Sequence, residues 1–269
     1  MNTATGADIG PLFEHFITTF DSKASLQFDH AYYTTHRKRF LRTARFIPHA
    51  TGEGSRALEL GATTLFQVAL KHVFGYAPVL GTHLTSDVER KRYRRTFEIG
   101  DLKTSNLLVS IDLESDIYPF EDSSTDFILC GEVIEHMDVD PMFMLAECNR
   151  ILKPGGTLLI TTPNCCSARN FWKIAQGYRP HFYMQYERSR NPYRHNIEYD
   201  VHSIVRFLQA AGFTPTSVET FDVFEEPLEE GIALLKSAGL PLDHRGDCIF
   251  ALARKTSGVV DRWPAGLYV

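Results

Sequence analysis

The chain has 269 residues, 43% of them hydrophobic, and a formal net charge of −5 at pH 7. This acidic balance disfavours a protein whose main partner is nucleic acid, because such proteins usually carry a basic patch for the phosphates. No apolar run approaches the ~20 residues that cross a bilayer, and no basic segment followed by an apolar run marks a signal peptide.

The five cysteines lack the spacing of a disulfide framework or a metal site. They indicate reduced thiols and a cytoplasmic location. The length suits one large domain with additions. A basic run at residues 90–95 is expected to be a solvated face.

The first 50 residues are expected to form a helical cap. Residues 11–20 predict a short helix. Residues 31–47 predict a longer one, because Tyr33, Phe40 and Ile47 fall near one face and basic residues take the other.

Short apolar runs alternate with helical segments between residues 51 and 255. Because these runs lack a clean period-2 pattern, they predict a parallel sheet with helices on both faces. Two helices are expected, at residues 64–74 and from the Asp140–Pro141 N-cap pair to Leu152. The first five strands are expected at residues 56–61, 78–83, 107–112, 127–130 and 157–162.

Residues 164–200 interrupt this alternation. They are rich in Tyr, Arg, Asn and Pro and have weak periodicity. An insertion of this length in a compact domain is usually functional, so a lid or substrate wall is expected. The alternation then resumes and ends in a tail: helices at 201–211 and 228–238, strands at 217–224 and 247–254, and the tail at 256–269.

The ends of strands one and three carry residues that suit a nucleoside ligand. Glu59 and Gly61 close strand one, and a glycine at a strand-to-helix turn lets the backbone approach a ligand. Asp112 and Leu113 close strand three, where a carboxylate can bind a polar edge of an adenosine and a leucine can cover its ring. Open α/β sheets bind their ligands at these carboxyl ends.

Strand four leads directly into Glu132, Glu135 and His136. If the chain is helical there, the spacing i, i+3, i+4 puts two carboxylates and an imidazole on one face. Such a set can hold a divalent cation or supply a general base. It can also be a plain helix start, where the dipole favours acids. The spacing leaves these three interpretations open.

The order of these motifs resembles that of the class I S-adenosylmethionine-dependent methyltransferases. The similarity covers about residues 50–165 well and 195–255 by topology, and the stretch from Pro119 to Asn164 is its most specific part. It implies a Rossmann-like, doubly wound α/β fold whose seven-stranded sheet has an antiparallel last strand. It also implies S-adenosylmethionine as cofactor, bound by Glu59, Gly61, Ala62, Thr63, Thr82, Asp112, Leu113, Cys130 and Gly131.

Two positions depart from the family pattern. Thr63 stands where the second glycine of the first motif usually occurs. Strand two ends in Thr82 and His83 rather than in the acid that binds the ribose hydroxyls. Either side chain can hydrogen-bond a ribose, although more weakly than a carboxylate does. These departures motivate one alternative, a non-catalytic binding module on the same fold.

The Glu-Val-Ile-Glu-His segment is similar to that of two methyltransferase groups, the small-RNA 3′-terminal 2′-O-methyltransferases and the ubiquinone-pathway O-methyltransferases. In those groups the two glutamates and the histidine bind a divalent metal, and the RNA enzymes add a later histidine that matches His195. The similarity implies Glu132, Glu135, His136 and His195 as ligands of Mg²⁺ or Mn²⁺. It also implies Glu135 and His136 as catalytic residues.

The expected activity is O-methylation of a small hydroxylated substrate in a biosynthetic pathway, such as a sugar, a glycan end or an aromatic diol. An alcohol needs help to lose its proton, which a bound cation can give. Methylation of an RNA 3′ end is the other enzymatic hypothesis, and the acidic charge counts against it. The expected partner is a small molecule or glycan; a homodimer is compatible with the sequence, which does not fix the oligomeric state.

Overall fold

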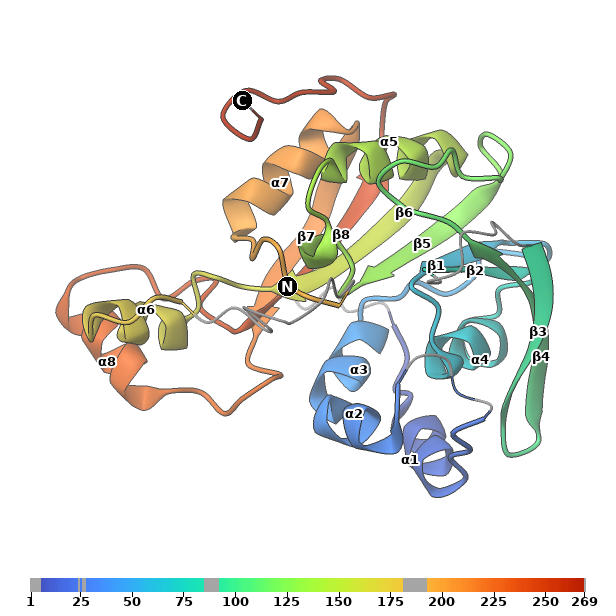
Figure 1. Ribbon diagram of the computed structural model, residues 1–269, viewed down its shortest axis with the longest axis horizontal. Helices are drawn as coiled ribbons and strands as arrows, with labels where there is room; N and C mark the ends of the chain where they lie inside the picture. The colour runs from blue at the N-terminus through green and yellow to red at the C-terminus, as the bar shows by residue number, and fades with distance from the viewer. Residues whose placement is uncertain (1–5, 24, 26–27, 85–91, 181–192, 269) are drawn as a thin grey trace.

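The structure is a computed structural model that describes residues 6–23, 25, 28–84, 92–180 and 193–268. A central mixed sheet organises the chain (Figure 1). Its five inner strands are parallel: β4 (Leu102–Ser110), β2 (Val79–His83), β1 (Ala57–Leu60), β5 (Thr125–Gly131) and β6 (Leu152–Pro163). Antiparallel pairings add β3 (Arg92–Ile99) at one edge and β8 (Cys248–Lys255) and β7 (Phe213–Phe221) at the other. The order is β3-β4-β2-β1-β5-β6-β8-β7, which confirms the expected α/β class and the antiparallel last strand.

The edge strand β3 brings the sheet to eight strands, where the sequence predicts seven. It pairs with β4 so that Ile99 lies opposite Leu102. Arg92 and Arg94 are exposed, whereas Phe97 is fully buried. Within the described residues, Arg92 and Arg94 of the basic run therefore lie on the solvent face of a half-buried strand, whose side chains alternate between solvent and core.

Helices cover both faces of the sheet (Figure 1). The helix α4 (Thr64–His72) and the N-terminal helices lie on one face, and α5 (Pro141–Ile151) and α7 (Val201–Ala210) lie on the other. Along β5, Phe127 and Leu129 belong to the first core, and Ile128 and Cys130 belong to the second. Burial on both faces explains why residues 127–130 of this strand are all apolar.

The N-terminal cap consists of three helices, α1 (Gly10–Thr18), α2 (His30–Thr35) and α3 (Arg37–Ala44). The single helix expected over residues 31–47 is thus broken at His36. Tyr33 and Phe40 are fully buried, with ring centroids 5.2 Å apart. Phe40 also contacts Phe66 at the start of α4, at 5.7 Å between centroids. The cap therefore packs over the turn between β1 and α4.

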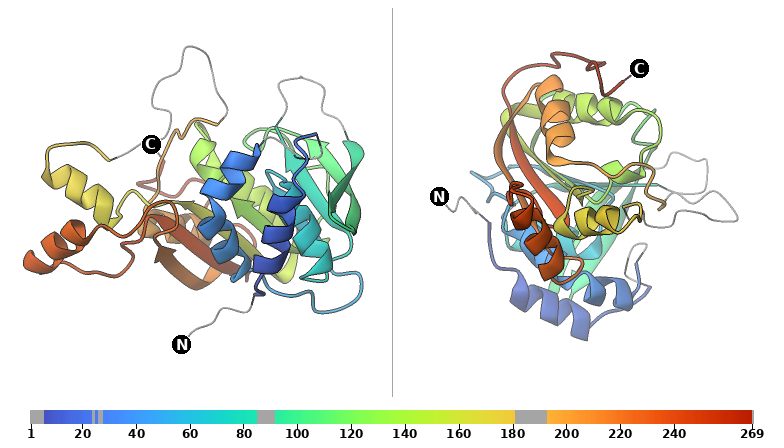
Figure 2. Two further views of the ribbon diagram at one scale, coloured as in Figure 1. Left: turned by 90° about the horizontal axis from the view of Figure 1, so that it is seen from below. Right: turned by 90° about the vertical axis from the view of Figure 1, so that its left-hand side faces the viewer.

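The expected insertion contains a helix of its own, α6 (Ala168–Ala175), which the side chain of Ser167 caps. It packs against α8 (Glu229–Ser237), and the pair projects from one end of the sheet (Figures 1 and 2). A Cβ at Gly231 would lie 2.4 Å from the carbonyl oxygen of Ala168, so only glycine permits this approach. Residues 181–192 of the insertion lie outside the described residues.

Candidate active site

A cavity of about 1260 Å³ opens at the carboxyl ends of the parallel strands, between the cap and the described parts of the insertion. Ala62 and Cys130 lie behind its wall, with no exposed surface. The cavity is lined by seven of the nine residues expected to bind the donor: Glu59, Gly61, Thr63, Thr82, Asp112, Leu113 and Gly131.

The turn after β1 is held by a buried carboxylate. Glu59 accepts hydrogen bonds from the amide and hydroxyl of Thr63 (2.9 and 2.8 Å) and from the side-chain amide of Gln67 (2.8 Å). Burial raises the pKa of Glu59 to about 8, against the opposing effect of these donors. Thr63 also caps α4 by accepting from the amide of Phe66. Its departure from glycine therefore has a structural role in this turn.

The end of β2 faces the same cavity through a histidine. His83 is 7% exposed, and its ring lies 3.0 Å from the hydroxyl of Tyr93 on β3. Burial lowers the pKa of His83, so the ring is neutral at pH 7. The hydroxyl of Thr82 accepts a hydrogen bond from the amide of Gly61 at 3.3 Å. The Tyr93 contact was not predicted, since β3 itself was overlooked.

The segment after β5 is not the helix that the sequence suggested. Glu132 adopts a left-handed backbone with φ 55°, and a single 3₁₀ turn follows at Ile134–His136. The i, i+3, i+4 face is therefore not formed. The carboxylate of Glu132 accepts from the hydroxyl of Thr161 at 2.8 Å, and it lies outside the cluster formed by the other three predicted ligands.

Glu135 and His136 both present lone pairs suited to a ligand. Glu135 is fully buried; its Oε2 accepts from Thr162 at 3.0 Å, and its Oε1 has no hydrogen-bond partner among the described residues. The Nδ1 of His136 lies 3.1 Å from the carbonyl oxygen of Arg194. Since a carbonyl only accepts, Nδ1 carries the proton and Nε2 keeps its lone pair. Burial lowers the pKa of His136 to about 4, so the ring is neutral at pH 7.

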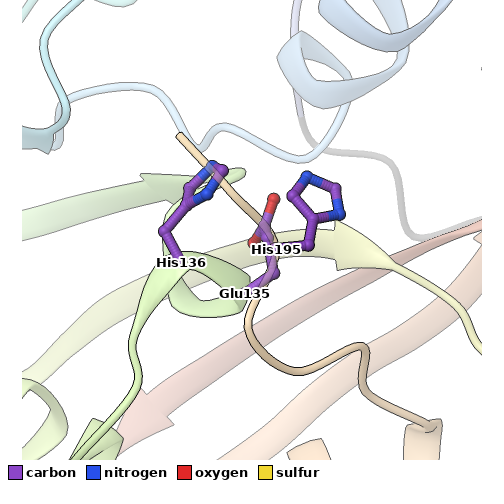
Figure 3. Close-up of side chains that lie close together, drawn as sticks. All are labelled: Glu135, His136 and His195. Atoms are coloured by element: carbon purple, nitrogen blue, oxygen red, sulfur yellow. The ribbon is translucent and has the colours of Figure 1, made fainter. Parts of the chain in front are cut away.

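His195 joins these two residues from the far end of the insertion (Figure 3). Its ring centroid lies 5.1 Å from that of His136. The neighbouring Asn196 anchors its loop, because its backbone amide donates to the carbonyl of Glu135 (2.8 Å) and its side chain to that of His136 (2.7 Å). Glu135, His136 and His195 each offer a ligand atom, and these atoms all lie within 4.8 Å of one another. One carboxylate and two imidazoles suit Mn²⁺ or a similar divalent ion.

Known proteins resemble this chain in sequence. Residues 58–160 match the family described as "Methyltransferase domain". A protein of Mycolicibacterium smegmatis named as a probable S-adenosylmethionine-dependent methyltransferase is 32% identical over 95 residues, which cover 35% of this chain and 31% of that protein. The ubiquinone biosynthesis O-methyltransferase of Methylococcus capsulatus is 29% identical over 131 residues, 49% of this chain and 53% of that enzyme. The chain thus spans between about a third and a half of these relatives.

A solved S-adenosylmethionine-dependent methyltransferase from Archaeoglobus fulgidus shares the fold. It matches 84% of this chain and 98% of its own, with a TM-score of 0.54 and 19% identity. The chain carries a class I S-adenosylmethionine-dependent methyltransferase domain. In the described part of this domain and its additions, no helix has both the length and the apolar character of a membrane span.

The cavity of the methyltransferase domain fits the methyl donor. Gly61 has φ 68°, and a Cβ there would lie 3.1 Å from the side chain of Val133, so glycine leaves room beside the turn. Asp112 and Leu113 line the same cavity from the end of β4. Tyr32 and His36 of the cap also line the cavity. Arg39 also lines it and was missed, because the pattern of the cap indicated only a basic, outward face.

Proposed function

We propose that this protein is an S-adenosylmethionine-dependent O-methyltransferase that acts on a small hydroxylated substrate with the help of a divalent cation. A sugar, a glycan end and an aromatic diol are the substrate classes in view. The observation that carries the proposal is the cluster of Glu135, His136 and His195. It lies in the same cavity as seven of the residues expected to bind the donor. Similarity to an enzyme named as an O-methyltransferase supports it.

The residues of the cluster can help the acceptor hydroxyl to lose its proton, which O-methylation requires. When bound, S-adenosylmethionine supplies an electrophilic methyl group. The hydroxyl that receives it has a pKa far above 7, and a cation bound by Glu135, His136 and His195 would lower that pKa. In the metal-free alternative, neutral His136 accepts the proton at Nε2 as a general base. In both cases much of the rate acceleration comes from side chains that hold the reacting groups in position.

Methylation assays with labelled donor and a panel of catechols and sugars test this proposal. We expect donor-dependent transfer that is lost on chelation and restored by Mn²⁺ or Mg²⁺. Transfer that survives exhaustive chelation would contradict the role of the metal and favour His136 as a general base. Undiminished transfer by a His136→Ala variant would contradict both roles.

Two alternatives have distinct outcomes. An RNA 3′-end methyltransferase would methylate RNA with an affinity that falls steeply with salt. A non-catalytic module would show no transfer, and no binding of S-adenosylmethionine at millimolar concentration. We further propose a cytoplasmic location, a homodimer, and a division into an N-terminal cap (1–50), a catalytic domain (51–255) with its lid (164–200), and a tail (256–269).

A further inference from the structure

Two adjacent cysteines, Cys165 and Cys166, follow the end of β6. The chain turns at this point, which brings their sulfur atoms to 3.8 Å from one another. Cys166 is exposed and Cys165 is partly exposed, whereas the other three cysteines, Cys130, Cys148 and Cys248, are fully buried. Reagents in solution can therefore reach this pair of thiols and no other cysteine of the folded protein.

The surroundings of Cys166 favour its thiolate, which is the form that reacts with electrophiles. A hydrogen bond from the thiol of Cys165 lowers the pKa of Cys166 to about 6, and the charge of Arg245 acts in the same direction, whereas burial and the charge of Asp200 oppose them. The guanidinium of Arg245 stays beside the pair because it donates to the carbonyl oxygen of Cys166 at 3.0 Å. The same contact between the sulfurs raises the pKa of Cys165, which keeps its proton. The pair thus combines a nucleophile with a thiol within its reach.

The backbone of the pair is bonded to the segment that carries His195, residues 193–199. The amide of Cys165 donates to the carbonyl oxygen of Tyr199 at 2.9 Å, and Asn164 forms an isolated β-bridge with Tyr199. Tyr199 is 3% exposed, so its position is well fixed. His195 lies four positions before it and belongs to the three-residue cluster. A change of the backbone at residues 165–166 should therefore displace His195.

We propose that Cys165 and Cys166 form a redox modification site, where oxidation by a peroxide closes a disulfide and displaces the segment that carries His195. The thiolate of Cys166 attacks the O–O bond of the peroxide and becomes a sulfenic acid, and the hydroxide that leaves takes up a proton to form water. The thiol of Cys165 then attacks the sulfenic sulfur: the S–S bond forms, the S–O bond breaks and a second water leaves. The two sulfurs lose two electrons, which the peroxide gains.

The disulfide would reshape the backbone that it closes. A disulfide usually joins Cα atoms about 4.4–6.8 Å apart, whereas the Cα atoms of neighbouring residues lie about 3.8 Å apart across a trans peptide. The ring is therefore strained, and a dithiol reductant should open it readily. Its closure should break the hydrogen bond between Cys165 and Tyr199. The consequence for metal binding rests on the proposed function, because His195 is one of the three proposed ligands.

Treatment of the protein with hydrogen peroxide, before and after reduction with dithiothreitol, tests this inference. Mass spectrometry of a digest made without reductant should show that the peptide with both cysteines is lighter by two hydrogen atoms. Hydrogen exchange should be faster in the oxidised protein at the amides of Cys165 and Asn196. Mn²⁺ affinity should fall about five- to tenfold, as expected for one lost hydrogen bond. Reduction should restore both quantities.

Cys166→Ser is the matched control, because it removes one sulfur from an exposed position outside the cavity lining. Peroxide should leave its hydrogen exchange and its Mn²⁺ affinity unchanged, and an equal effect there would place the oxidation elsewhere and overturn the inference. A sulfenic acid that persists at Cys166 beside a free Cys165 would also overturn it, as would a disulfide that leaves hydrogen exchange unchanged. Reduced wild-type protein that binds no Mn²⁺ would instead contradict the proposed metal site, whereas the peptide mass and hydrogen exchange test the disulfide without any metal.

Discussion

The proposed donor side of the cavity, at the turn from Glu59 to Gln67, and its proposed acceptor side, at Glu135, His136 and His195, are built in different ways. On the donor side, Glu59, Thr63 and Gln67 lie within eight positions of one another and form one hydrogen-bonded turn. On the acceptor side, His136 contacts the carbonyl of Arg194, 58 positions away. The donor side is thus a product of local sequence, whereas the acceptor side depends on the docking of a distant loop. A substitution on one side should therefore lower the affinity for the ligand of that side and leave the affinity for the other ligand unchanged.

The largest expected effect is on the acceptor side. Glu135→Gln keeps the shape and the contact with Thr162 but removes the charge that a cation needs. We expect Mn²⁺ affinity to fall by about 100-fold or more and methyl transfer by about 10³-fold, with S-adenosylhomocysteine affinity within twofold. Metal titration by electron paramagnetic resonance and calorimetry with the product measure these quantities.

Glu132→Gln is the informative comparison for that variant. The sequence assigns Glu132 to the metal site, but its carboxylate binds Thr161 and lies outside the three-residue cluster. Mn²⁺ affinity should therefore change by no more than a few-fold. A loss as large as that of Glu135→Gln would restore the four-ligand site and refute the three-ligand one.

The buried carboxyl of Glu59 on the donor side should make the stability of the protein depend on pH. The pKa of Glu59 is raised to about 8 in the fold because of burial, against an ordinary value of about 4.3. Below pH 4, Glu59 is protonated in the folded and in the unfolded protein, so its raised pKa does not lower the free energy of unfolding. Between about pH 4.5 and 8 it ionises only in the unfolded chain, so the free energy of unfolding falls as pH rises.

Urea denaturation of the ligand-free protein at pH 5 and pH 8 measures this dependence. Between pH 5 and pH 8, the free energy of unfolding of the wild type should fall by on the order of 3 kcal/mol more than that of Glu59→Gln. The comparison uses the change with pH because glutamine also loses some contacts with Thr63 and Gln67 at every pH. Equal losses in the two proteins would show that the three donors keep Glu59 ionised at both pH values.

The sequence predicted the parallel sheet, and most of the residues it offers for the donor do line one cavity, for a physical reason. Strand ends and their turns are encoded within a few residues, as in the segment from Glu59 to Thr63. The edge strand β3 was missed because Arg92, Arg94 and Arg95 make its first half resemble a charged, solvated run. The left-handed backbone of Glu132 and the burial of Arg39 depend on tertiary packing, which helical spacing does not encode. His195 was found only through family resemblance, since no local pattern links it to Glu135.

Asn196→Ala tests the docking of the distant loop with a smaller effect. The side chain of Asn196 donates to the carbonyl of His136 at 2.7 Å and has no place in the metal cluster itself. Its loss removes about 1–1.5 kcal/mol of anchoring, so Mn²⁺ affinity should fall about five- to tenfold. S-adenosylhomocysteine affinity should not change, because the donor turn is held by its own hydrogen bonds. A parallel loss of donor affinity would show that the two sides are coupled through the 134–136 turn. It would contradict the expectation that they respond independently to substitution.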